Sequence, residues 1–440
     1  MQERQVVISG TSALTPLGDT TDANFAALCA GGSATGLEAG FDTSACASRV
    51  VGRLPTGTDL SVGMRKDQIK YFRKNTKVMC RDIQLAVGAV GRAVAEAGLT
   101  LGDAATEPIL PGLNHARFGI LYGAGFIPIE LPELAATIMA ARRPDGSIDM
   151  TKWGHDGIPL AFPLWLLKYL PNMLACHVGI IWDCQGPSNT ITCNDASGLL
   201  AAGEAFRHLA RGTADMMLAG AAESKVHPSL LLRHHLLGNA TTHFHDRPEA
   251  AHRPFDVCRD GYACAEGSAA LIMETVDHAA GRGHKPLAMV AGFGSSCAAT
   301  TANVSETSGQ AIRLAIRAAL RDANLKPADI DVVAAQGSGT LGQDIAEATA
   351  IRETLGDVPV TAFSGGMGNI GAAQGIVGAA LACRMIAAGR VPPIRNCEEL
   401  DQRCPINAVR GQTLQRQVRT VLVLSAAISG QTAALIVRNT

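Results

Sequence analysis

The residues best placed to do chemistry stand at a strand–turn–helix junction, whose turn, residues 190–196, we call the elbow. A Gly-Pro turn leads into a short β-prone run, Asn194 and Asp195 follow, and small and apolar residues at helical spacing begin at Ala196. Such a junction holds a nucleophile at a helix N-terminus, where free N–H groups and the helix dipole stabilise negative charge. Here the turn presents Asp195, and the nearest thiol, Cys193, stands two residues earlier.

The junction and several other segments resemble the β-ketoacyl-acyl carrier protein synthases, which are condensing enzymes of the thiolase fold. The resemblance is carried by Gly186-Pro187-Ser188, residues 212–223, Leu170-Pro171-Asn172-Met173 and Arg253-Pro254-Phe255-Asp256. Counting on from Gly-Pro-Ser, the nucleophilic cysteine of that family falls at Asp195 in this chain. Cys193 shares a strand face with that position but does not stand at the helix end.

The family supplies one cysteine, two histidines and a lysine, so the resemblance implies a place for each. A decarboxylative condensation needs a thiolate to carry the acyl chain and donors that stabilise the developing oxyanion. The block 334–340 matches the one with the first histidine and holds Gln336, and the block 368–373 matches the second and holds Asn369. The place of the lysine is Ser364, and the gating loop of the family corresponds to Ile428, at the gate, with Ser429 and Gly430.

These departures remove the groups that the condensation requires. Gln336 and Asn369 exchange hydrogen bonds but do not transfer a proton near neutral pH as histidine does. Asp195 is a poor acyl carrier, and its charge repels a malonyl carboxylate. Cys193 has no histidine partner in either block, so we expect it to remain a thiol. Four losses in four separated blocks indicate a site no longer used for condensation.

Each of these residues also has a structural interpretation. Asp is a favoured N-cap residue, so we expect Asp195 to cap the helix that follows it. We expect Gln336 and Asn369 to be polar core groups that hydrogen-bond to each other or to Asp195, and Cys193 to be an inert buried thiol. The Arg and Asp residues of 253–260 are expected to fix a loop.

The composition restricts the classes of function. The 440-residue chain is 47% hydrophobic and 18% charged, and its formal net charge of −1 favours neither nucleic-acid binding nor a membrane surface. Twelve cysteines without CxxC pairs predict reduced thiols in the cytoplasm, with no metal and no cofactor. Residues 163–182 are apolar but interrupted by Lys168, Pro171 and His177, so we expect a core segment and no membrane insertion.

The order of the expected elements indicates an α/β architecture. Strands alternate with helices in two similar series, from a strand at 6–10 to a strand pair at 420–424 and 433–437. We expect an N-terminal half, 1–276, and a C-terminal half, 277–440. The resemblance implies the thiolase-like fold, with two βαβαβ-type halves in α-β-α-β-α layers. Residues 128–165 lack strong periodicity and are expected to form an insertion that covers the site.

The resemblance therefore implies a non-condensing ketosynthase homologue, similar to the chain-length-factor subunits of type II polyketide systems. Such subunits pair with an active ketosynthase through the strand before the elbow, and acyl carrier protein is the second partner implied. Apolar residues at the shared interface would set the length of chain that fits the partner's tunnel. Two alternatives stay open: a malonyl decarboxylase or hydrolase with Asp195 as its base, and a homodimeric scaffold that docks carrier protein.

Overall fold

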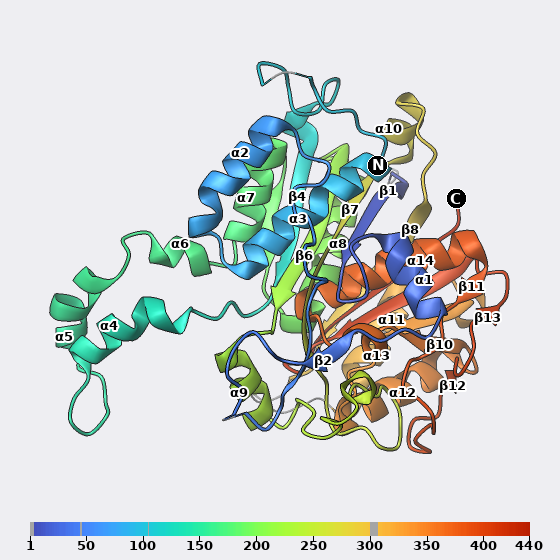
Figure 1. Cartoon of the computed structure of the whole chain (residues 1–440). Helices are drawn as coiled ribbons and strands as arrows, with labels where there is room; N and C mark the ends of the chain where they lie inside the picture. Colours follow the sequence, from blue (N-terminus) through green and yellow to red (C-terminus); the bar gives the residue numbers. More distant parts are fainter. Residues whose placement is uncertain (1–3, 45, 104, 300–306) are drawn as a thin grey trace.

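The strands form two sets that follow one another along the chain (Figure 1). The computed structural model describes residues 4–44, 46–103, 105–299 and 307–440. The first set comprises β1 (Val6–Leu14), β4 (Phe118–Ala124), β5 (Ser188–Ile191), β6 (Met216–Ser224) and β7 (Cys264–Thr275). The second set comprises β8 (Ala288–Cys297), β9 (Val332–Ala335), β10 (Pro359–Ala362), β14 (Thr420–Ala426) and β15 (Gln431–Arg438).

Both sets have the same strand order and the same directions. The order is β5-β4-β6-β7-β1 in the first set and β10-β9-β14-β15-β8 in the second, with β1 and β8 paired between them. β4 is parallel to β5 and β6, and β7 is antiparallel to β6 and β1. The second set repeats this with β9 and β15 in the same roles. The predicted α/β fold of two similar halves is confirmed, whereas their boundary at 276 remains a prediction.

Helices fill three layers around these two sets of strands. α8 (Ser197–Ala210) and α14 (Gln374–Ala388) form the middle layer, because both contact strands of both halves. α3 (Arg81–Glu96) and α7 (Met173–Trp182) cover the first half, and α11 (Gln310–Ala323) and α12 (Leu341–Leu355) cover the second. One apolar cluster lies in the middle layer and one beneath each outer layer, which gives the predicted α-β-α-β-α arrangement.

Small residues let the middle helices approach their neighbours closely. A Cβ atom at Gly198 would lie 2.4 Å from the carbonyl oxygen of Ala372, and one at Gly203 would lie 2.3 Å from the Phe293 ring. Close packing of this kind leaves no room for larger side chains. Among the described helices, Gly371–Ala388 is long and apolar enough to cross a membrane, and 78% of it is buried inside the protein.

The remaining elements are short or lie at the edges of this frame. They include α1 (Thr21–Cys29), β2 (Thr35–Leu37), β3 (Val50–Gly52), α2 (Lys66–Asn75), α9 (Pro228–Leu236), α10 (Val276–Gly281), α13 (Ser364–Met367), β11 (Arg390–Val391), β12 (Asn407–Ala408) and β13 (Leu414–Gln415). As expected, charged pairs fix the loop before β7: Arg253 lies 3.0 Å from Asp256, and Arg259 lies 2.8 Å from Asp401.

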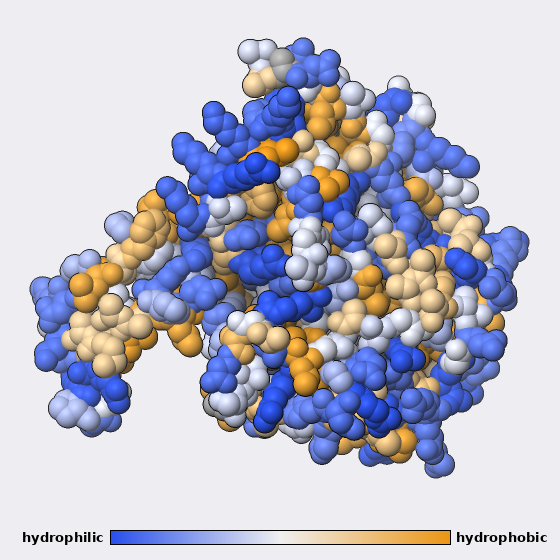
Figure 2. All heavy atoms as spheres, in the orientation of Figure 1, coloured by the Kyte–Doolittle hydropathy of each residue, from blue (hydrophilic) through white to orange (hydrophobic). Residues whose placement is uncertain are grey.

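Residues 126–167 form an arm that extends from the body (Figure 1) and carries apolar side chains on its surface (Figure 2). It contains α4 (Leu131–Ala141), α5 (Met150–Lys152) and most of the chain up to α6 (Trp165–Tyr169). The prediction that this segment covers the site is wrong, since α4 packs on α5 and the turns that follow it. The prediction of a core segment at 163–182 is correct for the buried face of α7 and wrong for α6, where Leu166 is 51% exposed.

Candidate functional site

The candidate site lies where the carboxyl ends of two sets of parallel strands meet. β4, β5 and β6 are parallel in the first half, and β9, β10 and β14 are parallel in the second. Parallel strands end at one edge of a sheet, and ligand sites of α/β proteins form there. The residues that follow these strands include Asp195 after β5, Lys225 after β6, Gln336 after β9, Ser364 after β10 and Ile428 after β14.

Asp195 stands in the elbow but does not cap α8. The chain turns at Asn194, whose φ of 49° lies in the left-handed region that Asn tolerates better than most residues. Asp195 follows in a single 3₁₀ turn, and the hydroxyl of Ser197 accepts the N–H of Cys193 at 2.7 Å. The predicted N-cap role of Asp195 is wrong, because its carboxylate turns to a buried ammonium that offers a stronger, charge-assisted hydrogen bond.

Lys225 supplies that ammonium and joins two of the predicted site residues. Its Nζ donates to Oδ1 of Asp195 and to Oδ1 of Asn369, each at 2.8 Å. The expected contact of Asn369 with Asp195 is therefore made through Lys225. Burial opposes the charge on Lys225, but the carboxylates of Asp195 and Glu223 raise the pKa of its ammonium above the ordinary value. The lysine is accordingly charged at neutral pH, and its pair with Asp195 is an ion pair.

Glu223 is a buried carboxylate close to this ion pair. The four residues Asp195, Glu223, Lys225 and Asn369 form what we call the site cluster. Oε2 of Glu223 accepts the N–H of Ala372 at 2.7 Å, and Oδ1 of Asn369 accepts the N–H of Gly371 at 2.8 Å. Burial raises the pKa of Glu223, Lys225 opposes that rise, and Asp195 adds to it. The cluster thus holds its polar groups in mutual contacts and in contacts with the backbone of the second matched block.

Gln336 is held in the other half of the site. Its backbone N–H donates to Oε1 of Glu347 at 2.7 Å, and its side-chain oxygen accepts the hydroxyl of Ser425 at 3.0 Å. That hydroxyl also lies 2.6 Å from the carbonyl oxygen of Asp195. Burial raises the pKa of Glu347 to about 7, although the N–H groups of Gly337 and Gln336 lower it. Gln336 is a buried polar group, as expected, but its side-chain oxygen bonds to Ser425 in place of the expected partner, Asn369 or Asp195.

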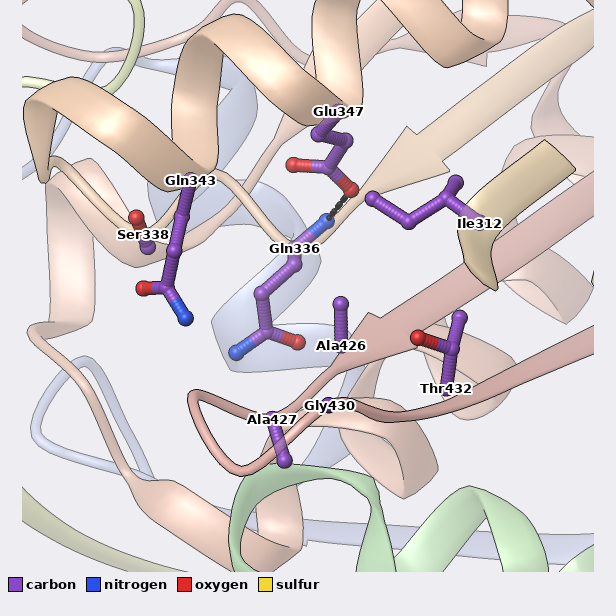
Figure 3. Close-up of a pocket in the computed structure, with 9 residues that line it drawn as sticks. All are labelled: Ile312, Gln336, Ser338, Gln343, Glu347, Ala426, Ala427, Gly430 and Thr432. Carbon is purple, nitrogen blue, oxygen red and sulfur yellow. Dashed lines mark hydrogen bonds between the residues drawn. The ribbon is translucent and has the colours of Figure 1, made fainter. Parts of the chain in front are cut away.

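A small cavity adjoins Gln336 (Figure 3). The side chains of Gln336 and Gln343 point into it, Ile312 and Ala426 supply apolar walls, and Thr432 adds a hydroxyl group (Figure 3). Its volume is about 20 Å³. A single water molecule needs roughly 10–15 Å³ of such space, so the cavity holds about one water and no acyl group.

The remaining predicted residues fix the surrounding loops. Ser364 donates its hydroxyl hydrogen to the carbonyl of Gly337 at 2.6 Å. The side-chain amide of Asn194 donates to Ser429 at 2.8 Å, which ties the loop of Ile428 and Gly430 to the elbow. Burial, with Cys297 nearby, raises the pKa of the half-buried Cys193 thiol. The thiol form therefore dominates near neutral pH.

Lys225 is the residue of the site that sequence reasoning missed. The resembling segment 212–223 stops two residues before it, and no family position pointed to it. A physical signal was nevertheless present. A lysine directly after a buried strand in a parallel set lies at the edge where the other strands of that set also end.

Comparison with known proteins identifies the family. The models of the beta-ketoacyl synthase N-terminal and C-terminal domains match residues 3–279 and 287–398. The chain belongs to the beta-ketoacyl synthase family. The 3-oxoacyl-[acyl-carrier-protein] synthase 2 of Synechocystis sp. is 28% identical over 99% of this chain and 98% of the relative. The actinorhodin polyketide beta-ketoacyl synthase 1 of Streptomyces coelicolor is also 28% identical, over 99% of this chain and 89% of the relative.

A solved structure agrees with this assignment. It is described as a type II PKS acyl-carrier protein in complex with its ketosynthase bound to the hexaketide. It covers 100% of both chains with a TM-score of 0.82 and 25% identity. The predicted ketosynthase family and its thiolase-like fold are therefore confirmed.

Proposed function

We propose that this ketosynthase homologue does not condense acyl groups and instead acts as a chain-length-factor-like partner of an active β-ketoacyl-ACP synthase. The observation that carries the proposal is the ion pair between Lys225 and Asp195 at the elbow. A condensing site keeps a nucleophile free to attack a thioester. Here the group at the elbow is a carboxylate whose oxygen is already bound to a buried ammonium.

The surroundings of the ion pair support the same conclusion. Asn369 and Gln336 accept hydrogen bonds from Lys225 and Ser425, and neither amide transfers protons near neutral pH. The cavity beside Gln336 has a volume of about 20 Å³, far below the several hundred Å³ of ordinary ligand pockets. A carrier-bound acyl chain therefore finds no nucleophile at position 195 and no space in the cavity beside Gln336.

The surface has two features suited to binding another protein, a free strand edge and exposed apolar side chains. β5 lies at the end of the sheet and, among the strands that the structure describes, pairs only with β4, so its outer edge can pair with another chain. α7 contacts β5, and α6 of the arm contacts α7. Seven large apolar residues of the arm are more than half exposed, and we call them the arm face: Phe126, Leu131, Met139, Met150, Ile158, Leu160 and Leu166.

An apolar face of this kind marks a protein interface. Its position beside a free strand edge supports a ketosynthase as the partner. We place this partner against β5, in contact with the arm. The apolar side chains of the arm and of α7 would then contribute to the acyl tunnel and limit its length. This assignment extends to type II polyketide or fatty-acid-type biosynthesis.

A second surface fits an acidic carrier protein. Five exposed cations lie on α2 and the 3₁₀ turn after it: Lys66, Lys70, Arg73, Lys74 and Lys77. Asp67 in the same helix is paired with Arg65, which leaves the face positively charged. Clustered cations steer an acidic partner toward the surface that carries them. We assign the docking of acyl carrier protein to this face.

Co-expression with an intact type II ketosynthase tests the proposal. We expect the two chains to co-purify as a heterodimer and the length of the product to change when residues of the arm face are enlarged or reduced. A native mass measurement separates this result from a homodimeric scaffold, which forms pairs without the ketosynthase. A ketosynthase that never co-purifies with this chain and makes an unchanged product would refute the proposal.

The alternative of a malonyl decarboxylase or hydrolase with Asp195 as its base has less support. A general base must be free to accept a proton from the substrate, and the Asp195 carboxylate is engaged by Lys225. Incubation of the purified chain with malonyl-carrier protein decides between them. Turnover that disappears in Asp195→Ala would establish the enzyme, and the absence of turnover in the natural chain agrees with the partner role.

A further inference from the structure

Lys225 joins three segments that are far apart in the sequence. It is the first residue after β6, and its backbone N–H donates to the carbonyl of Ala265 in β7 at 3.0 Å. Its ammonium binds Asp195 of the elbow and Asn369 of the second matched block, and it lies 5.3 Å from the centre of the Tyr262 ring. The side chain is 5% exposed, so these contacts are made away from water.

The charge of Lys225 balances a buried acidic region. Asp195 binds the ammonium directly, and the carboxylate of Glu223 lies nearby, packed between Gly125 and Gly371. A Cβ atom at Gly371 would lie 1.9 Å from Oε2 of Glu223, which shows how closely the elbow region is packed around these groups. Without the lysine, the carboxylate of Asp195 would be buried and unpaired, the least favourable state for a charge in a protein.

The two ends of the elbow differ in how tightly the chain is held. On its C-terminal side, α8 is part of the buried middle layer and is fixed by small residues in close contact. On its N-terminal side, β5 is an edge strand with hydrogen bonds to β4 alone among the described strands. A displacement of the elbow would therefore propagate into β5 rather than into α8.

The other contacts of the elbow are neutral and would remain. Ser197 accepts the N–H of Cys193, Ser425 lies 2.6 Å from the carbonyl oxygen of Asp195, and Asn194 donates to Ser429. The backbone of Asn194 is already in the left-handed region, so the elbow depends on its surroundings to keep this shape. Lys225 adds a charged contact to these neutral ones.

We propose that Lys225 is a positioning residue that couples the former catalytic position to the exposed edge strand, so that the buried ion pair sets the shape of β5 for a partner chain. The proposal rests on the proposed partner function. It also gives a role to the Asp at position 195, where the family has its nucleophile, because the carboxylate forms the ion pair that holds the elbow.

Hydrogen exchange on the isolated chain tests the coupling without any partner. In Lys225→Met, we expect amides of residues 188–195 to exchange at least tenfold faster, with α8 and the strands of the C-terminal half unchanged. The double variant Lys225→Met/Asp195→Asn removes the unpaired carboxylate as well, so these amides should exchange more slowly than in Lys225→Met but still faster than in the natural chain, because the ion pair is absent. Lys285→Met, at an exposed position between α10 and β8, is the matched control and should change nothing at the elbow.

Several results would overturn the coupling. Unchanged exchange in residues 188–195 would show that the neutral contacts suffice, and equal acceleration throughout the chain would show a general loss of stability. If Lys225→Met fails to fold, Asp195→Asn leaves the lysine buried without its carboxylate and should accelerate the same amides. An unchanged elbow in that variant would contradict the proposal.

Affinity for an intact type II ketosynthase provides the second measurement. We expect Lys225→Met to weaken binding at least tenfold at a temperature where circular dichroism shows it folded, and the double variant to recover only part of the loss, because it still lacks the ion pair. Equal affinity of the single variant and the natural chain would contradict the coupling. If the natural chain itself does not bind, the proposed function fails, and the exchange measurement still decides the role of Lys225.

Discussion

The site cluster and the arm face are opposites in their chemistry and in their surroundings. The site cluster is charged and polar yet buried, and its members bind one another and the backbone. The arm face is apolar yet exposed, with Met150 at 71% and Leu160 at 57% of full exposure. Polar residues normally lie at the surface and apolar residues in the interior, so both regions depart from the usual distribution.

The difference indicates where the function of the chain lies. Buried polar groups are tolerated when they are fully hydrogen-bonded, so the site cluster is a stable part of the interior without a ligand. Exposed apolar side chains gain free energy only when another surface covers them. The site cluster therefore needs no further partner, whereas the arm face is stabilised when another protein covers it.

The largest expected effect comes from breaking the site cluster. Lys225→Met leaves Asp195 as an unpaired buried charge, and loss of one partner of a buried ion pair typically costs about 3–5 kcal/mol. We expect the free energy of unfolding, measured by urea denaturation, to fall by that order. Lys225→Met/Asp195→Asn should recover most of the loss, because neither member of the buried ion pair remains. A double variant no more stable than the single one would show that packing around the lysine stem, rather than charge, dominates.

Substitution of the arm face should have the opposite signature. Leu160→Ser and Leu166→Ser remove exposed apolar groups, so the stability of the isolated chain should change by less than about 0.5 kcal/mol. Association with the ketosynthase should weaken, since a fully buried leucine contributes roughly 1.5–3 kcal/mol. Isothermal titration of the double variant measures the loss.

Leu314→Ser is the matched control for the arm. Leu314 is 45% exposed on α11, in the outer layer of the other half. It should leave both stability and association unchanged. Equal losses of association in the control and in the arm variants would remove the distinction between the two surfaces.

The same contrast explains what the sequence could predict. The elbow and the strands follow from local signals, and the strands expected at 6–10, 420–424 and 433–437 lie within β1, β14 and β15. The partners of Asp195 depend on which strand ends meet, and that meeting is set by the order of strands far apart in sequence. N-cap propensity predicted a local role for Asp195, but a buried ammonium from β6 provided a stronger partner.

The arm was misjudged for a related reason. Its apolar residues favour burial, and a single sequence does not distinguish burial in the same chain from burial in a partner. α6 was therefore expected in the core, although Leu164, Leu166 and Leu167 are exposed. The weak periodicity of residues 128–165 correctly indicated a segment outside the repeated halves. It did not indicate whether the segment would pack over the site or extend away from the body.

A smaller effect should appear in the dependence of stability on pH. Burial, and then Glu223, raise the pKa of Asp82 to about 8 in the folded chain. The unfolded value is about 3.9, so the folded state holds the proton more tightly, and this contribution to stability is lost as the pH rises from about 4 to about 8. Glu347, with a pKa raised by burial to about 7, acts in the same direction.

Asp82→Asn isolates the contribution of this carboxyl group. The amide stays neutral at every pH and keeps an oxygen to accept the N–H of Ser224, which lies 3.1 Å from Oδ1 of Asp82. We expect the free energy of unfolding of the variant to fall less steeply than that of the natural chain between about pH 5 and pH 8. Parallel curves for the two proteins would show that Asp82 ionises in the folded chain as it does in the unfolded one.

The smallest effect concerns the cations of α2. Lys70→Glu with Lys74→Glu reverses charge on an exposed face, and contacts between exposed charges contribute about 0.2–1 kcal/mol each. We expect the affinity for acyl carrier protein to fall severalfold at low salt, with the difference shrinking as salt screens the charges. Surface plasmon resonance at two ionic strengths measures both effects. Arg317→Glu with Arg321→Glu on α11 provides the control, because it makes the same double reversal on exposed residues of the other half, and an equal loss there would indicate attraction by overall charge.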